Sequence, residues 1–157
     1  MTMATMPQDP PDDSVELGAL SEFAGYHLRR ASSVFAADFA RALDGTGMRQ
    51  VLFGILSVVA ANPNINQGAV GRALGIQRAN MVALINELVD RALIERRASK
   101  DDRRAFALCL SSEGQAMLDE CLARIRVHEE EMLLGLGVAD RARLIALLLR
   151  IEAKERG

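Results

Sequence analysis

The sequence is short of the side chains on which most enzymes rely, because its 157 residues include no tryptophan, one tyrosine, two histidines and two cysteines. Cys109 and Cys121 have no close cysteine or histidine neighbour, which fits neither a zinc site nor a disulfide framework. His128 precedes three glutamates but lacks the second histidine of a zinc-binding helix, and the sequence contains no glycine-rich phosphate loop or Gly-x-Ser-x-Gly turn. These absences predict a protein that is not an enzyme and that uses neither metal nor cofactor.

Long hydrophobic runs are also missing. The best candidate, residues 51–61, is far shorter than the roughly 20 residues of a membrane-spanning helix, so it predicts a buried helix and no membrane partner. Residues 1–13 carry prolines and aspartates but no basic or apolar signal region, and we expect a disordered leader there and a cytoplasmic protein.

Most of the chain has apolar residues at three- and four-residue steps, the spacing of amphipathic helices. Ser14 and Ser111 are candidate caps, Gly75 marks a tight turn, and Gly114 is expected to be tolerated inside its helix. The predicted helices cover 17–43, 48–60, 67–74, 77–92, 112–132 and 139–154.

A short β-hairpin is predicted between the fourth and fifth of these helices. Phe106, Leu108 and Leu110 alternate with smaller side chains, a period of two that is typical of a half-buried strand. Residues 94–97 are its partner strand and the polar residues 98–104 its exposed tip. The predicted fold class is therefore mainly α with a small β-hairpin wing (α+β), a winged helix-turn-helix flanked by dimerisation helices.

This hairpin places Cys109 on the face of the strand that points away from the core, whereas Cys121 lies on the apolar stripe of a helix. Neither cysteine has a sequence neighbour that would obviously lower its thiol pKa. We expect both to be packing residues, with a redox sensor as the alternative.

Charge is unevenly distributed along the chain. Residues 72–104 contain eight basic and five acidic side chains, a local charge of +3, so the net charge of −2 leaves −5 for all other residues. A basic segment within a near-neutral chain is compatible with binding to DNA.

The expected organisation is a leader (1–13), an N-terminal dimerisation helix (14–46), a winged helix-turn-helix lobe (47–111) and C-terminal dimerisation helices (112–157). The terminal helices have wide apolar stripes that must be buried, and a second copy of the chain in a two-fold dimer would bury them. The alternative is that they pack on their own central lobe as a monomeric bundle.

The DNA contacts are predicted from the helical wheel of residues 77–92, on which one side is expected to be buried and contains Met81, Leu84, Ile85 and Leu88. The opposite side would enter the major groove, where amides and Arg78 can bond base edges and small apolar side chains can contact thymine methyl groups. Alternatively, Val82 and Ala83 contact another helix, and the hairpin tip is only a solvated charged loop. The candidate contacts are Gln67, Gln77, Arg78, Ala79, Asn80, Val82, Ala83, Asn86, Lys100, Arg103 and Arg104.

Residues 73–81 (ALGIQRANM), 88–97 (LVDRALIERR) and the Asp-x-Arg wing at 102–104, which leads into Leu-x-Leu-Ser, resemble the MarR-type transcriptional regulators. The resemblance covers about 15–155 and implies a homodimeric repressor of a pseudo-palindromic operator. In such a protein Asp102 would orient Arg104, and a wing arginine would enter the minor groove.

The resemblance also implies a small-molecule effector that binds where the dimer helices meet the DNA-binding lobe. A resemblance of residues 61–67 and 74–80 to the subgroup that controls hydroxycinnamate breakdown points to an aromatic acid or an aromatic acyl-CoA thioester, such as feruloyl-CoA or p-coumaroyl-CoA. The candidate effector contacts are Tyr26, His27, Arg29, Arg30, Arg49 and Phe53.

Several alternatives stay open at this point. His27 can instead be a hydrogen-bonded core or interface residue, and the protein can be a MarR-type regulator of efflux or stress genes that responds to phenolic compounds or oxidants. A winged-helix protein-interaction module without DNA binding is the alternative from another class.

Overall fold

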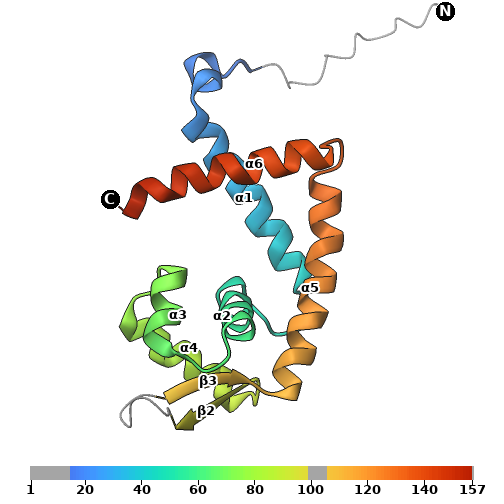
Figure 1. The fold of residues 1–157 in the computed structure, drawn as a ribbon. Helices are drawn as coiled ribbons and strands as arrows, with labels where there is room; N and C mark the ends of the chain where they lie inside the picture. The colour runs from blue at the N-terminus through green and yellow to red at the C-terminus, as the bar shows by residue number, and fades with distance from the viewer. Residues whose placement is uncertain (1–14, 99–105, 157) are drawn as a thin grey trace, which may run out of the picture. The chain divides into compact units, whose positions relative to one another are not determined.

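The computed structural model describes residues 15–98 and 106–156, which are mainly helical (Figure 1). The chain divides into two compact units, Met1–Phe35 and Ala36–Gly157, and each unit is described by itself. No helix in the described ranges has the length and apolar character needed to cross a membrane. The α-helices are α1 (Ala24–Ala42), α2 (Gln50–Ala61), α3 (Gln67–Leu74), α4 (Arg78–Asp90), α5 (Ser112–Met132) and α6 (Val138–Glu152), with short 3-10 helices at Gly18–Glu22 and Ala153–Arg156.

The prediction of one continuous helix over 17–43 is wrong, because the chain breaks at Phe23. Gly18 has a φ of 54°, and Phe23 is extended with φ −96° and ψ 113°. The Phe23 carbonyl then accepts the first hydrogen bonds of α1, from the amides of Tyr26 and His27. Residue Ser14, the expected cap, lies outside the described residues.

The predicted hairpin is confirmed, but it belongs to a three-stranded antiparallel sheet. Strand β3 (Phe106–Leu110) lies between β2 (Ile94–Ala98) and β1 (Ile65–Asn66), a two-residue strand that the sequence pattern did not predict. The order is β1-β3-β2, and Leu108 pairs with Ile65 on one side and Arg96 on the other.

Two expectations for β3 are wrong. Phe106 is 61% exposed rather than in the core, because it lies at the outer end of the strand beside the hairpin tip. Cys109 is buried rather than facing solvent, because the segment after α2 covers that face and the Cys109 thiol donates to Asn64 Oδ1 at 3.2 Å.

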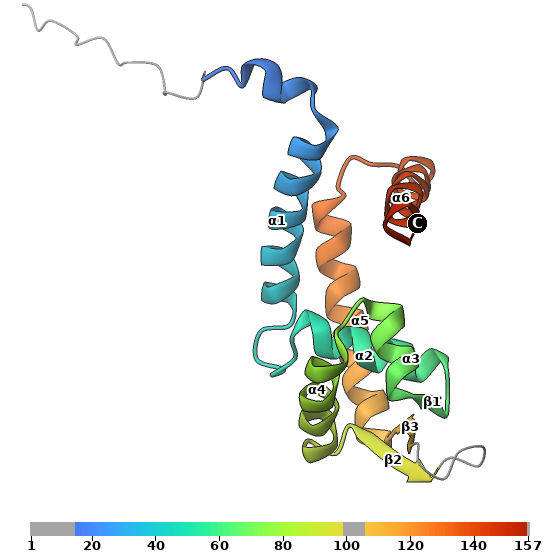
Figure 2. The same cartoon turned by 90° about the vertical axis from the view of Figure 1, so that its left-hand side faces the viewer.

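The core of the second unit joins α2, α4, β3 and α5, which Figure 2 shows grouped around the sheet. Ser111 caps α5 as predicted, since its hydroxyl accepts from the Gly114 amide at 2.8 Å. Gly114 is required rather than merely tolerated, because a Cβ there would lie 1.9 Å from the carbonyl oxygen of Leu93. The fully buried side chains of this core include Leu52, Ile55, Leu56, Met81, Ile85, Leu88, Leu108 and Cys121.

One buried carboxylate joins the end of α1 to α5 within the second unit. Asp38 is 7% exposed, and it accepts from Arg41 at 2.9 Å and from Nδ1 of His128 at 3.2 Å. The Arg41 hydrogen bond holds the Asp38 pKa below its ordinary value, with His128 adding to this effect against the cost of burial.

Candidate nucleic-acid interface

A tight turn sets the angle between α3 and α4. Asn66 caps α3 by accepting from the Ala69 amide at 2.9 Å, and Gly75 ends the helix in the left-handed conformation with φ 66°. The Ile76 amide closes the turn onto the Gly71 carbonyl at 2.8 Å. At Gly71 a Cβ would lie 3.0 Å from the Met81 side chain, so this glycine lets α4 approach α3 closely.

Helix α4 divides into a buried and an exposed side, as the helical wheel predicted. Met81, Ile85 and Leu88 are fully buried in the core, whereas Val82 is 47% exposed. The exposed side therefore presents an apolar side chain to solvent. The exposed residues of α4 and its N-cap include Gln77, Arg78, Ala79, Asn80, Val82, Ala83 and Asn86.

Four side-chain hydrogen bonds hold the second half of α4 and the residue that follows it. Glu87 forms an ion pair with Arg49, the N-cap residue of α2. Arg91, just after the helix, donates to the Gly47 carbonyl at 2.9 Å and the Thr46 carbonyl at 3.3 Å. Asn86 accepts a hydrogen bond from Arg96 of β2, so the helix is tied to the sheet as well as to the loop before α2.

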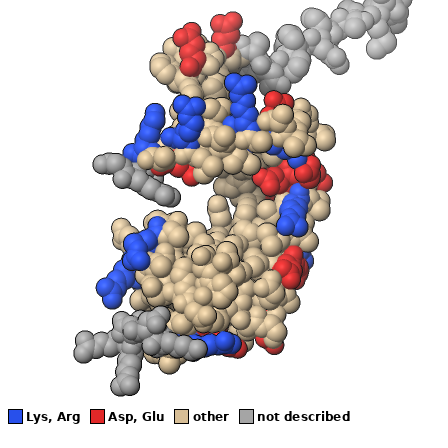
Figure 3. All heavy atoms as spheres, in the orientation of Figure 1, with Lys and Arg blue, Asp and Glu red and all other residues tan. Residues whose placement is uncertain are grey.

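A hollow of about 860 Å³ opens between the start of α3, the start of α4 and strand β3. Gln67, Arg72 and Arg78 line it together with Val82 and Phe106. In Figure 3 basic side chains lie over the α3–α4 edge of this lobe. Two arginines beside an exposed apolar stripe can bind phosphates and thymine methyl groups of a duplex.

The structure brings four of the predicted contacts together around this hollow, namely Gln67, Gln77, Arg78 and Val82. The other predicted contacts of α4 are exposed, and Lys100, Asp102, Arg103 and Arg104 lie outside the described residues. The sequence pattern did not predict that Arg72 and Phe106 line this hollow, nor that Arg96 contacts Asn86. Arg72 and Arg96 belong to the basic segment 72–104, but the charge count does not show where their side chains lie. The alternating pattern of the strand predicted Phe106 in the core.

The expected effector contacts fall in both units. In the first unit, the guanidinium carbons of Arg29 and Arg30 lie 5.6 and 5.8 Å from the centroid of the Tyr26 ring, and Arg30 donates to the Tyr26 hydroxyl at 3.4 Å. His27 Nε2 lies 3.0 Å from the Ser21 carbonyl, which can only accept, so the ring nitrogen donates.

In the second unit, Phe53 is half-buried and packs edge-on against Phe39 with ring centroids 5.6 Å apart. Arg49 pairs with Glu87 as described above. Both residues thus have a structural role within their own unit.

The comparisons with known proteins agree with this geometry. Residues 47–105 match the MarR family. A regulatory protein of Thauera aromatica, assigned to transcription of the hcr operon, is 32% identical over 135 residues, which cover 85% of this chain and 81% of that protein.

Solved structures of the transcriptional repressor CouR are similar over the same range. CouR bound to a 23-mer DNA duplex is 33% identical, covers 88% of this chain and 99% of its own, and superposes with a TM-score of 0.83. CouR bound to p-coumaroyl-CoA is 31% identical, covers 88% and 98% of the two chains, and has a TM-score of 0.76. The similarity in sequence, together with the winged helix and its exposed α4 surface, shows that this chain belongs to the MarR family of transcriptional regulators.

Proposed function

We propose that the protein is a homodimeric repressor that binds a pseudo-palindromic operator in double-stranded DNA and leaves it when an aromatic acyl-CoA thioester binds. The observation that carries this proposal is the similarity to CouR in both its DNA-bound and its p-coumaroyl-CoA-bound structures. The exposed stripe of α4 supports the DNA part, because the major groove is read by the exposed face of such a helix. The proposed place of action is the cytoplasm.

The chemistry of the first unit supports an anionic aromatic effector. The guanidinium groups of Arg29 and Arg30 lie 5.6 and 5.8 Å from the Tyr26 ring centroid, so two cations lie beside one aromatic ring. Guanidinium groups bind phosphates in a forked geometry, which suits the phosphates of coenzyme A. His27 is proposed to hold this cluster in place through its bond to Ser21.

The apolar surface of α6 supports the dimer. No residue of α6 is buried, and Leu144, Ile145, Leu147, Leu149 and Ile151 are all exposed. An apolar stripe of this size is stable in water only when another surface covers it, and a second copy in a two-fold arrangement would do so. Two recognition helices at a fixed separation would then match two half-sites.

The test is a titration of the full-length protein onto a labelled duplex from the region upstream of its own gene. We expect salt-dependent binding and release by p-coumaroyl-CoA or feruloyl-CoA, but not by free coenzyme A. Release by the free acids alone would make the effector an aromatic acid. If no duplex binds in a salt-dependent way, the proposal is wrong.

The wing is tested separately. Arg104→Ala should weaken binding to every duplex and lower the slope of log affinity against log salt by about one, because one phosphate-neutralising charge is lost. An unchanged affinity at fixed salt would remove Arg104 from the interface.

The double variant Arg29→Gln with Arg30→Gln tests the proposed effector site. It should raise the concentration of p-coumaroyl-CoA needed for release and leave DNA affinity unchanged.

A further inference from the structure

The contact between Asn86 on α4 and Arg96 on β2 has a consequence for base recognition. Arg96 Nη2 donates to Asn86 Oδ1, and both residues are exposed. A guanidinium group has only N–H donors, so the amide oxygen is the atom that can face it. The amide nitrogen of Asn86 therefore points away from Arg96, and it carries only hydrogen-bond donors.

Asn86 lies on the exposed stripe of α4. It follows Ala79, Val82 and Ala83 at intervals of seven, four and three residues, which places all four on one side of the helix. At 1.5 Å per residue, Asn86 is about 10 Å farther along the helix axis than Ala79. It would therefore meet DNA at the flank of the contacts made by the first turns of α4.

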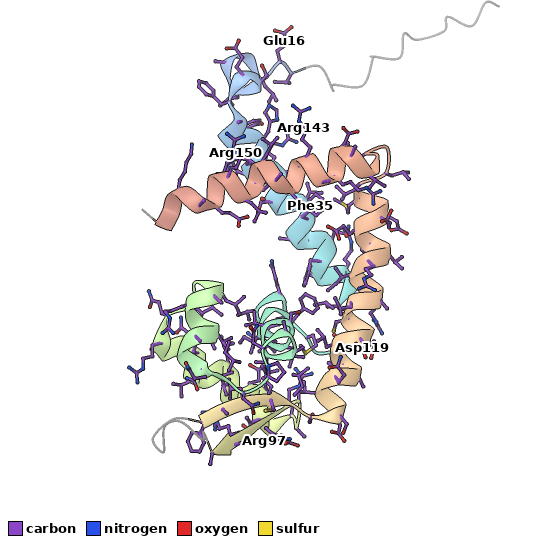
Figure 4. The ribbon with its side chains drawn as sticks, in the orientation of Figure 1. Glu16, Phe35, Arg97, Asp119, Arg143 and Arg150 are labelled. Carbon is purple, nitrogen blue, oxygen red and sulfur yellow. The ribbon has the colours of Figure 1, made fainter. Side chains whose placement is uncertain are left out.

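Strand β2 presents Arg96 on the proper face for this contact. Successive side chains of a strand point to opposite faces, so Arg96 lies on one face and Glu95 and Arg97 on the other. Arg97 is indeed paired with Glu95 at 2.9 Å. Arg97, which Figure 4 labels on β2, therefore offers a matched control with the same charge on the same strand and the opposite face.

We propose that Arg96 is a positioning residue that fixes the Asn86 amide as a hydrogen-bond donor toward the DNA, so that Asn86 selects a base with a major-groove acceptor at one flanking position of each half-site. Guanine O6 or N7, adenine N7 and thymine O4 would be accepted, and a cytosine N4 amino group facing the amide would be rejected. This inference rests on the proposed DNA binding and adds the chemical sense of one contact to it.

The experiment selects duplexes from a random pool with the full-length protein and with Asn86→Ala, Arg96→Ala and Arg97→Ala. We expect Asn86→Ala and Arg96→Ala each to weaken the base preference at the same flanking position by about tenfold in relative affinity, which is the range of a single base contact. Arg97→Ala should leave the base preference unchanged at every position. Thermal unfolding should be little changed, because both side chains are exposed.

Asn86→Asp gives the sharpest result. Its carboxylate can still accept from Arg96, but it turns an acceptor toward the DNA, so the preference should move to a base that offers an amino group. Lower overall affinity from the added negative charge does not affect the relative preferences.

Each outcome decides one statement. An unchanged preference in Asn86→Ala would overturn the base contact, and a preference that is lost in Asn86→Ala but kept in Arg96→Ala would overturn the positioning role of Arg96. If the wild-type protein selects no duplex at all, the proposed function itself fails, whereas selection with unaltered variants refutes only this inference.

Discussion

Helices α4 and α6 have similar apolar periodicity in the sequence but differ in what covers it. Met81, Ile85 and Leu88 of α4 are at most 1% exposed, whereas Ile145 and Leu149 of α6 are each 57% exposed. The lobe around α4 thus completes its core within one chain, and α6 does not. An apolar stripe shows that a helix must be covered, but it does not show whether the cover comes from the same chain.

The largest effect is expected inside the completed lobe. Gly114→Ala would place a Cβ 1.9 Å from the Leu93 carbonyl oxygen, and the free energy of unfolding should fall by about 3 kcal/mol because backbone must move. Chemical denaturation measures this loss. Gly25→Ala, where a Cβ meets nothing within 4 Å, is the control and should not destabilise the protein. Equal stability of both variants would contradict the close contact.

The next effect belongs to α6. Ile145→Asp with Leu149→Asp should weaken dimerisation about 100-fold or more, because the second copy would have to bury two carboxylates in an apolar interface. Sedimentation equilibrium measures the dissociation constant, and circular dichroism should show an intact fold because both side chains are exposed in one chain. Ile145→Val with Leu149→Met keeps the surface apolar and is the control. An unchanged dimer would mean that α6 is covered by something else.

The next prediction concerns the buried carboxylate of Asp38, which joins α1 to α5 through His128. The pKa of Asp38 in the folded protein is lower than its ordinary value of 3.8. The ionised carboxylate therefore stabilises the fold at pH values above 3.8, and this stabilisation is lost as the pH falls through the lowered pKa. Asp38→Asn should therefore destabilise the protein near neutral pH, and the difference from wild type should shrink below about pH 4.

Thermal unfolding between pH 3 and 7 measures this difference. Asp119→Asn, an exposed carboxylate of α5 labelled in Figure 4, is the control. A destabilisation by Asp38→Asn that is constant over this range would show that ionisation of Asp38 is not involved.

A smaller effect is expected at the turn after α4. Ala92 has a φ of 57°, and its amide and that of Leu93 return to Val89 and Leu88 at 2.9 Å each, which is the usual geometry of a glycine that ends a helix. Ala92→Gly should relieve the left-handed strain and raise the free energy of unfolding by roughly 0.5 kcal/mol after the entropy cost of glycine. Denaturant titration would detect it, and a loss of stability would contradict the strain.

The smallest effect is expected for oxidation. Burial, with Glu120 beside it, raises the pKa of the Cys121 thiol. Cys109 is also buried, so an oxidant has little access to either sulfur atom. DNA affinity measured after mild peroxide treatment should be unchanged. A loss of affinity that Cys109→Ser prevents would establish a redox role for that residue.

The sequence predicted elements that depend on short-range signals. The order of helices, the turn at Gly75 and the cap at Ser111 were predicted correctly, because each depends on residues within about one helical turn. The exposed side of α4 was also predicted, since helical periodicity determines which residues share a side. The break at Phe23 was missed because Gly18 and Phe23 interrupt an apolar pattern that runs through them.

What the tertiary structure alone decided are the contacts between distant segments. The strand β1, the burial of Cys109 by Asn64, the need for glycine at position 114 and the Arg96–Asn86 bond each join elements that no local pattern relates. The sequence by itself determined which side chains share the exposed side of α4. Only the packing of β2 against α4 decided the direction in which one of them is held, because a hydrogen bond between two elements depends on their position in space rather than on their spacing in the chain.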